Sequence, residues 1–169
     1  MRAKIIVGFG TLAAAILTVA AIAAVSTLNL FKPAPEVRFT ALSGEAFSTS
    51  ELRGKVVLVN FWGTYCAPCL HEMPRVVDAH RKFAALGYET VAVAVRHDNP
   101  QRVAQFAASR ALPFKVAFDR SGEIAKEFGN VRITPTIFLI DKQGRVLRRY
   151  VGEPNWSELH ELVERELRS

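Results

Sequence analysis

Two cysteines are all that this sequence of 169 residues contains, and they stand three positions apart, at Cys66 and Cys69. No disulfide within the chain can therefore close a long loop, which excludes a scaffold stapled by several disulfides. A second C-x-x-C pair is missing too, so a structural zinc site would need scattered histidines to complete its four ligands. Methionine is equally scarce, with two residues. A copper chaperone would be expected to offer more soft ligands than these, so both metals are disfavoured.

Other signals are absent as well. Half of the residues are hydrophobic and the formal net charge is +6, a composition that excludes a disordered or collagen-like chain. A polytopic membrane protein is excluded because only one stretch is long and apolar enough to span a bilayer. There is no basic run interleaved with aromatic residues, so nucleic acid is not an expected partner.

The one long apolar stretch lies at the N-terminus. Residues 5–31 carry no charge, and residues 5–25 would form a helix about 31 Å long, close to the roughly 30 Å of bilayer hydrocarbon. Arg2 and Lys4 precede it and favour a cytoplasmic N-terminus, which places the rest of the chain outside. The alternative is a cleaved signal peptide with Ala21-Ile22-Ala23 as its cleavage site, which would export the domain as well.

Three segments follow from this pattern. Residues 1–31 are predicted to be the membrane anchor or signal segment. Residues 32–36, which read K-P-A-P-E, are predicted to be a short stiff linker because proline fixes φ and favours an extended chain. Residues 37–169 are then a single exported domain.

Apolar strands alternate with helices along this domain. The strands are expected at residues 37–42, 46–47, 55–62, 88–95, 115–118, 136–140 and 146–151, and the helices at residues 66–86, 100–109, 122–128 and from Asn155 onward. The run at residues 55–62 is nearly all apolar and rich in β-branched residues, which is typical of a central strand covered on both faces. Asn155 and Glu158 form a candidate capping box. The order predicts an α/β sandwich around one mixed sheet.

The cysteine pair lies between a predicted strand and a predicted helix. That position places Cys66 at the helix N-terminus, where unpaired N–H groups and the positive end of the dipole stabilise a thiolate. Cysteines in such C-x-x-C sites have pKa values of about 3.5 to 7.5, compared with about 8.5 for a free thiol. Cys66 is therefore the predicted nucleophile and Cys69 the predicted resolving thiol.

Two motifs carry a family resemblance. Residues 60–74 read N-F-W-G-T-Y-C-A-P-C-L-H-E-M-P, and residues 129–141 read G-N-V-R-I-T-P-T-I-F-L-I-D. From residue 37 to its end the chain resembles the membrane-anchored, exported thioredoxin-fold proteins of the ResA/TlpA type. The resemblance implies a thioredoxin fold with an N-terminal β-hairpin, and an inserted helix within residues 98–111. It also implies that Pro74 is the proline that kinks the first helix.

The resemblance also implies roles for residues around the cysteines. The Thr134–Pro135 bond is expected to be cis, which would place Pro135 against the cysteine pair and free the Thr134 backbone to pair with a substrate strand. Trp62 is expected to shield the disulfide and Tyr65 to line the groove, so these four residues form the predicted substrate-binding set.

A proton acceptor for Cys69 is also required. Thioredoxins use a buried Asp on the central strand, but this chain has Asn60 at that position. Glu72 lies one helical turn after Cys69, where ResA-type proteins carry a functional Glu. A partly buried Glu72 would have a raised pKa and could exchange protons with the thiols near neutral pH. Glu72 therefore joins Cys66 and Cys69 as the third predicted catalytic residue.

The resemblance implies a thiol–disulfide oxidoreductase on the outer, periplasmic face of a bacterial inner membrane. Its expected task is to reduce disulfides of exported proteins such as apocytochrome c during cytochrome c maturation, with electrons from a transmembrane thiol donor. No cofactor or metal is expected, since the dithiol itself carries two electrons. Two alternatives stay open, namely an oxidant or isomerase that forms disulfides, and a copper-handling module in oxidase assembly.

Overall fold

A computed structural model of the chain describes residues 32–169, which include the compact unit Pro33–Ser169. The strands, in chain order, are β1 (Arg38–Thr40), β2 (Ala46–Ser48), β3 (Val56–Trp62), β4 (Tyr88–Ala94), β5 (Lys115–Phe118), β6 (Thr136–Ile140) and β7 (Val146–Val151). The helices are α2 (Ala67–Phe83), α3 (Pro100–Ser109), α4 (Glu123–Glu127) and α5 (Trp156–Arg168), with 3-10 turns η1 (Ser50–Leu52) and η2 (Ala84–Leu86). The predicted anchor of residues 1–31 lies outside the described residues. Across residues 32–169, no helix combines the length and hydropathy that a bilayer crossing requires.

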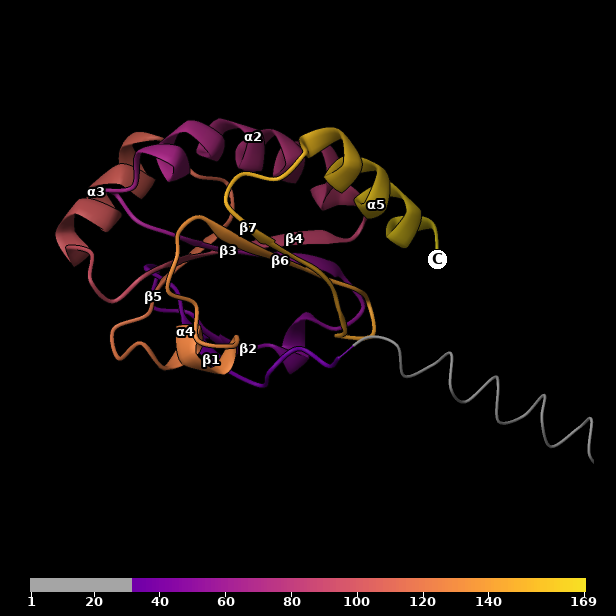
Figure 1. The fold of residues 1–169 in the computed structure, drawn as a ribbon, viewed down its shortest axis with the longest axis horizontal. Coiled ribbons are helices and arrows are strands. Elements are labelled where there is room, and N and C mark those ends of the chain that lie inside the picture. Colours follow the sequence, from indigo (N-terminus) through magenta and orange to yellow (C-terminus); the bar gives the residue numbers. More distant parts are fainter. Residues whose placement is uncertain (1–31) are drawn as a thin grey trace, which may run out of the picture. The chain divides into compact units, whose positions relative to one another are not determined.

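The centre of the fold is a five-stranded sheet in the order β5-β4-β3-β6-β7 (Figure 1). β3 pairs with β4 in parallel and with β6 in antiparallel, so the sheet is mixed, as predicted. β1 and β2 form the predicted N-terminal hairpin, a separate two-stranded sheet. Parallel pairing of β3 with β4 requires a crossover, and α2 supplies it.

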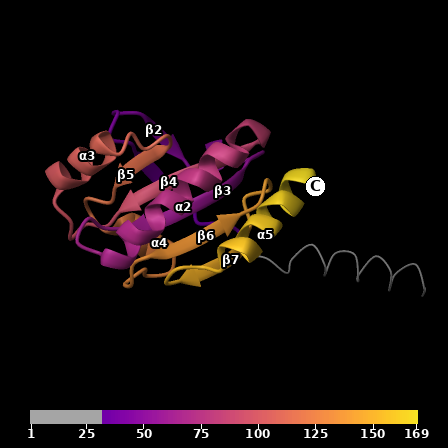
Figure 2. The same ribbon diagram turned by 90° about the horizontal axis from the view of Figure 1, so that it is seen from above.

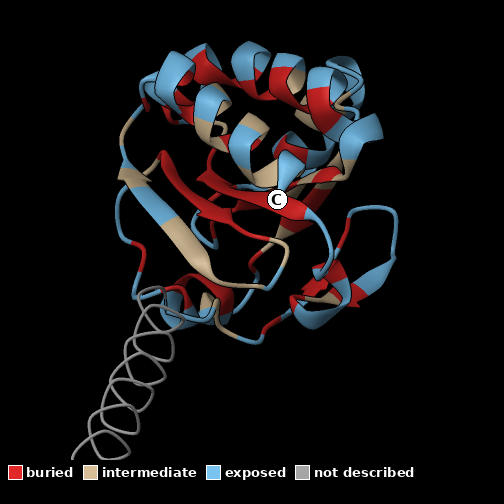
Figure 3. Cartoon of the chain, turned by 90° about the vertical axis from the view of Figure 1, so that its right-hand side faces the viewer, coloured by how far each residue is buried: buried red, intermediate tan, exposed pale blue. Residues whose placement is uncertain are grey.

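Helices cover one face of the sheet, while the hairpin and the short helix α4 cover the other (Figures 1 and 2). α2, α3 and α5 lie together on the first face and enclose one apolar cluster with the sheet. The β1–β2 hairpin and α4 enclose a second cluster on the opposite face. The central strands are buried on both sides, whereas the outer surfaces of the helices are exposed (Figure 3).

β3 supplies side chains to both apolar clusters in turn, because successive residues of a strand point to opposite faces. Leu58 and Trp62 belong to the cluster beneath α2, and Val59 and Phe61 belong to the cluster beneath the hairpin. Asn60 has the same parity as Leu58 and Trp62, so its polar side chain points toward α2. Every residue of β3 is buried, which agrees with the prediction of a strand covered on both faces.

The helix predicted for residues 66–86 is shorter than expected. Cys66 is the N-cap rather than the first helical residue, and the α-helix ends at Phe83. A 3-10 turn follows and stops at Gly87, whose φ of +96° is the left-handed conformation that glycine adopts most readily. Pro74 lies inside α2, as the resemblance implied.

The helices α3 and α5 begin at asparagine caps. Asn99 Oδ1 accepts hydrogen bonds from the backbone N–H groups of Gln101 and Arg102 at the start of the inserted helix α3. Asn155 caps α5 in the same way, by accepting from Ser157 and Glu158. The predicted capping box is closed differently, because Glu158 accepts from the Asn155 side chain instead of its backbone. Together with the mixed sheet and its two covered faces, these helices confirm the predicted α/β sandwich.

The predicted linker is in contact with the domain. The Ala34 backbone N–H donates to the Gly144 carbonyl at 2.8 Å, and Pro33 forms an isolated β-bridge with Arg145. Residues 33 and 34 are therefore held against the turn between β6 and β7.

Candidate active site

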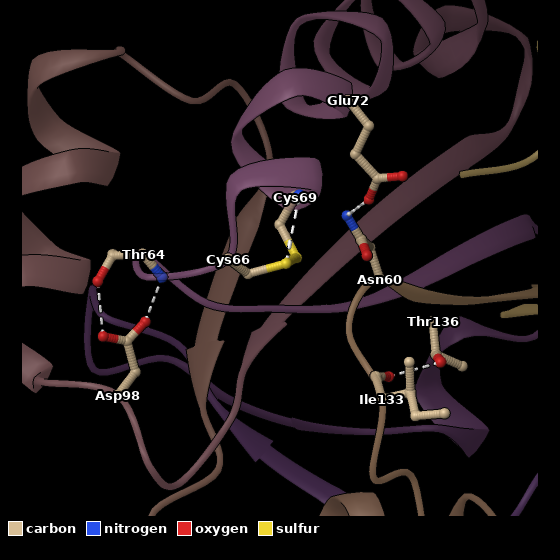
Figure 4. Close-up of a disulfide and its surroundings, with 8 residues drawn as sticks. All are labelled: Asn60, Thr64, Cys66, Cys69, Glu72, Asp98, Ile133 and Thr136. Atoms are coloured by element: carbon tan, nitrogen blue, oxygen red, sulfur yellow. Dashed lines mark hydrogen bonds between the residues drawn. A yellow bond between two sulfur atoms is a disulfide. The ribbon is translucent and has the colours of Figure 1, made fainter. Parts of the chain in front are cut away.

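Cys66 and Cys69 lie where β3 passes through a short loop into α2. Cys66 caps the helix, and its Sγ accepts a hydrogen bond from the Cys69 backbone N–H at 3.3 Å. The two residues form a disulfide, with Cα atoms 5.2 Å apart (Figure 4). After reduction, the same N–H group and the positive end of the α2 dipole would stabilise a thiolate on Cys66.

The two sulfurs differ in their access to solvent. Cys66 retains 8% of its surface, whereas Cys69 is completely buried. An incoming disulfide therefore reaches Cys66 before Cys69. This asymmetry agrees with the predicted roles of Cys66 as nucleophile and Cys69 as resolving thiol.

Asp98 fixes the loop before Cys66, a role that the sequence analysis missed. Its largely buried carboxylate accepts hydrogen bonds from the Thr64 backbone N–H and from Thr64 Oγ1, the latter at 2.6 Å (Figure 4). The Asn99 backbone N–H donates to the same carboxylate at 2.7 Å. The active-site loop is thereby tied to the start of the inserted helix α3. The sequence offers no motif for this contact, because Thr64 and Asp98 are 34 residues apart.

The second loop of the site leads into β6. The Thr134–Pro135 peptide bond is cis, as predicted. Thr136 Oγ1 donates to the Ile133 carbonyl at 2.7 Å across this bend, and the Gly152 N–H donates to the Pro135 carbonyl at 2.8 Å. Within residues 32–169, the backbone of Thr134 makes no hydrogen bond. Its N–H and carbonyl groups are therefore unpaired within the described domain.

Glu72, in the second turn of α2, is completely buried although its side chain is ionisable. Asn60 Nδ2 donates to Glu72 Oε1 at 3.1 Å (Figure 4). The second oxygen, Oε2, has no hydrogen-bond partner among the described residues. Burial therefore disfavours the ionised carboxylate and raises the pKa of Glu72 to about 8, even though the Asn60 hydrogen bond acts in the opposite direction. The predicted rise in the Glu72 pKa is confirmed.

Glu153 adds negative charge near Glu72. Trp156 Nε1 donates to Glu153 Oε1 at 3.1 Å, and this hydrogen bond lowers the pKa of Glu153. His71 and Arg75, both on α2, lie 3.3 and 3.2 Å from the Glu153 carboxylate. Repulsion by Glu153 is a smaller contribution to the raised pKa of Glu72 than burial is.

Trp62 and Tyr65 lie in opposite environments. Tyr65 is 59% exposed beside the cysteines, as expected for a residue that lines a groove. Trp62 is completely buried and packs against the Phe106 ring of α3, with centroids 5.2 Å apart. This burial suits the expected role of shielding the disulfide, but it leaves none of the ring on the surface that a substrate would reach. Trp62 instead shares one apolar cluster with both cysteines.

The structure brings most of the predicted site residues together. Tyr65 and Thr134, from different loops, line one cavity of about 560 Å³. Cys66, Cys69 and Glu72 follow one another along the first turns of α2. Among residues 32–169, no three His, Cys, Asp or Glu side chains gather closely enough to hold a metal ion. The groups that remain are a dithiol pair, a buried carboxyl and an open backbone segment, which together suit thiol–disulfide exchange.

Comparison with known proteins agrees with this chemistry. Residues 31–164 match the family described as Redoxin. A thiol-disulfide oxidoreductase ResA of Bacillus thuringiensis subsp. konkukian is 36% identical over 138 residues, which cover 82% of this chain and 79% of the relative. A protein of the same name from Bacillus subtilis is 32% identical over 130 residues, covering 77% and 72%.

Solved structures show the same fold. A thiol:disulfide interchange protein of the thioredoxin family from Chlorobium tepidum TLS superimposes with a TM-score of 0.73 at 28% identity, covering 81% of this chain and 97% of that one. StoA from Bacillus subtilis superimposes with a TM-score of 0.65 at 25% identity, covering 76% and 96%. The thioredoxin fold implied by the two motifs is confirmed.

Proposed function

The chain belongs to the Redoxin family as a thiol–disulfide oxidoreductase, and from this premise we propose that it reduces disulfides of selected exported proteins through Cys66 and Cys69. The Cys66 thiolate attacks one sulfur of the client disulfide, which breaks that S–S bond, forms a mixed disulfide and releases a client thiolate. Cys69 then loses its proton and attacks Cys66 Sγ, which breaks the mixed disulfide and releases the second client thiolate. The products are the Cys66–Cys69 disulfide and a fully reduced client, so two electrons have moved to the client.

The observation that carries the reducing direction is the burial of Glu72 one turn beyond Cys69. A strong disulfide oxidant needs a reduced form in which the thiolate is strongly stabilised. A buried carboxyl gives no such stabilisation, because its protonated form carries no positive charge and its ionised form would repel a nearby thiolate. With a pKa of about 8, Glu72 is largely protonated at neutral pH, and its ionised fraction serves as the base that takes the Cys69 proton.

Client recognition is assigned to the two loops beside Cys66. The open backbone of Thr134 can pair with an extended client segment, and Pro135 closes the bend behind it. Tyr65 offers an exposed aromatic face beside the same segment. Backbone pairing alone reads little sequence, so side-chain contacts must supply the selectivity.

The location of the enzyme is proposed from the apolar run of residues 5–25 and the basic residues Arg2 and Lys4. These features support a single-pass anchor in a bacterial inner membrane with the domain on the periplasmic side. There, clients such as apocytochrome c would need reduced cysteines for haem attachment, and a transmembrane thiol protein would supply the electrons.

A trapping experiment tests the exchange mechanism. In Cys69→Ser, Cys66 can form a mixed disulfide that nothing resolves, so covalent client adducts should accumulate in cells and disappear with a reductant. Cys66→Ser should give none and is the matched control. The absence of adducts in Cys69→Ser, alongside an active wild type, would contradict the mechanism.

A redox titration tests the direction. A reductant should have a potential near the roughly −270 mV of thioredoxin, whereas a strong oxidant lies near about −120 mV. A measured potential close to the second value would overturn the reducing assignment and leave the oxidant alternative.

A further inference from the structure

The cavity shared by Tyr65 and Thr134 extends away from the cysteines toward α4. Its remaining walls are formed by the loop after β4, by the loop and first turn of α4, and by the segment that precedes Thr134. A volume of about 560 Å³ is enough for several side chains of a peptide. The cavity therefore begins at Tyr65, the residue before Cys66, and continues where the residues flanking a client disulfide would lie.

The loop after β4 is fixed against the active-site loop at two points. The Val95 N–H donates to the Trp62 carbonyl at 3.0 Å, and Asp98 holds both the N–H and the hydroxyl of Thr64. Figure 4 shows the Asp98 loop and the Ile133 loop on two sides of the disulfide. Arg96 and His97 lie between these two anchor points, so the backbone at both residues is held close to the loop that leads to Cys66.

The two acidic residues of the cavity already have partners. Asp119 is almost completely buried, and its carboxylate accepts from the N–H groups of Gly122, Ile124 and Ala125. Glu123 pairs with Lys126 at 2.9 Å. Glu123 is therefore paired with a cation, while both oxygens of Asp119 are engaged by backbone N–H groups of the α4 turn rather than by a cationic side chain.

Two arginines of the cavity have no ion-pair partner among the described residues. Arg96 and Arg132 are exposed, and within residues 32–169 neither has a carboxylate within 4.0 Å. Arg96 lies across Gly122, where an added Cβ would stand 2.7 Å from Arg96 Cδ. Arg96 Nε also donates to His97 Nε2 at 3.3 Å. The guanidinium of Arg96 is thus placed by the loop and by the absence of a side chain at Gly122.

We propose that this cavity is a specificity subsite that binds acidic residues flanking the client disulfide, with Arg96 and Arg132 as its cationic contacts. The inference rests on the proposed function and adds the chemical class of its clients. Exposed Ile133, next to Thr134, offers apolar contact to the same peptide segment. Guanidinium groups suit carboxylates because they can donate two parallel hydrogen bonds.

Three disulfide peptides test the subsite. They share one cystine and differ only in three flanking residues, which are all Asp, all Ser or all Lys. With the reduced full-length protein at low salt, kcat/KM should be about five- to tenfold higher for the Asp peptide than for the Ser peptide, and lowest for the Lys peptide. The preference should shrink as salt rises.

Charge reversal provides the matched comparison. The double variant Arg96→Glu/Arg132→Glu should invert the peptide order, whereas Arg165→Glu/Arg168→Glu, which changes net charge equally on α5, should preserve it. The rate with the uncharged 2-hydroxyethyl disulfide is measured for each variant, and its peptide rates are divided by that rate, so that any change in the dithiol itself does not affect the comparison.

The outcomes separate the subsite from the proposed function. Suppose that the uncharged disulfide is reduced. If kcat/KM is then no higher for the Asp peptide than for the Ser peptide, or stays higher in Arg96→Glu/Arg132→Glu, the subsite proposal is wrong while the proposed function stands. Equal peptide rates together with arginine-dependent binding to vesicles of anionic lipid would overturn it in favour of a membrane contact. If no disulfide is reduced, the proposed function fails and the subsite falls with it.

Discussion

Asn60 donates a hydrogen bond to Glu72 at 3.1 Å in a region where both side chains are completely buried. One residue comes from the central strand β3 and the other from the second turn of α2, so the contact joins the sheet to the helix that carries the cysteines. Asn60 contributes a donor and no charge, which leaves Glu72 as the ionisable member of the pair.

Glu72→Gln should slow the resolving step near neutral pH by roughly tenfold or more while leaving the fold intact, because a glutamine cannot accept the Cys69 proton. In the wild type, the rate of client release should rise with an inflection near pH 8, since burial raises the pKa of Glu72 to about 8. Stopped-flow measurement of that step across pH 6–10 checks this. Glu161→Gln, on the exposed side of α5, is the control, and an inflection that persists unchanged in Glu72→Gln would refute the role.

The same carboxyl should make folding stability depend on pH. Because the pKa of Glu72 is raised in the folded protein, the unfolded chain loses this proton at lower pH, and stability falls as pH rises from about 4.5 to about 8. The expected loss is on the order of 3–5 kcal/mol. Urea unfolding of the oxidised protein should therefore show that the free energy of unfolding of Glu72→Gln increases relative to that of the wild type as pH rises over this range. Parallel pH curves for the two proteins would contradict the expectation.

Asn60→Ala should move the inflection to higher pH. The Asn60 hydrogen bond stabilises the ionised carboxylate, so its loss should raise the pKa of Glu72 further. The pH–rate profile or carboxyl 13C chemical shifts can measure the change. In the double variant Asn60→Ala/Glu72→Gln the inflection should be absent, and an inflection at an unchanged pH in Asn60→Ala would count against the coupling.

Asp98→Asn should destabilise the protein by about 1–3 kcal/mol, because the charged acceptor of two N–H groups and a hydroxyl is lost. Thr64→Val removes only the hydroxyl contact and keeps the backbone one, so its cost should be smaller, about 1 kcal/mol. Urea unfolding gives both values. Equal costs for the two variants would show that the backbone contact contributes nothing.

Much of this site was predictable from local sequence. The i to i+3 spacing along one helix places Cys66 at the tip, Cys69 one turn deeper and Glu72 one turn beyond that. The alternation of side chains along β3 explains why Asn60 meets Glu72, since even-numbered residues of that strand face α2.

Contacts between distant segments were not predictable in this way. The Thr64–Asp98 tie depends on the crossover that brings the ends of β3 and β4 together, and no spacing rule reports it. The packing partner of Trp62 was not predictable for a related reason. Trp62 precedes the loop that carries the cysteines, but the alternation of side chains along β3 turns its ring into the core, against Phe106, which lies 44 residues further along the chain.

The complete burial of Cys69 behind Cys66 also determines which sulfur of the reduced enzyme peroxide oxidises first. A soluble peroxide encounters the Cys66 sulfur first and converts it to sulfenic acid, which can condense with the neighbouring Cys69 thiol to restore the disulfide. This condensation consumes the sulfenic acid before it can be oxidised irreversibly to sulfinic acid. Mass spectrometry after peroxide treatment should find sulfinic acid in Cys69→Ser and an intact disulfide in the wild type, so the same burial that orders the exchange steps also makes the catalytic sulfur repairable.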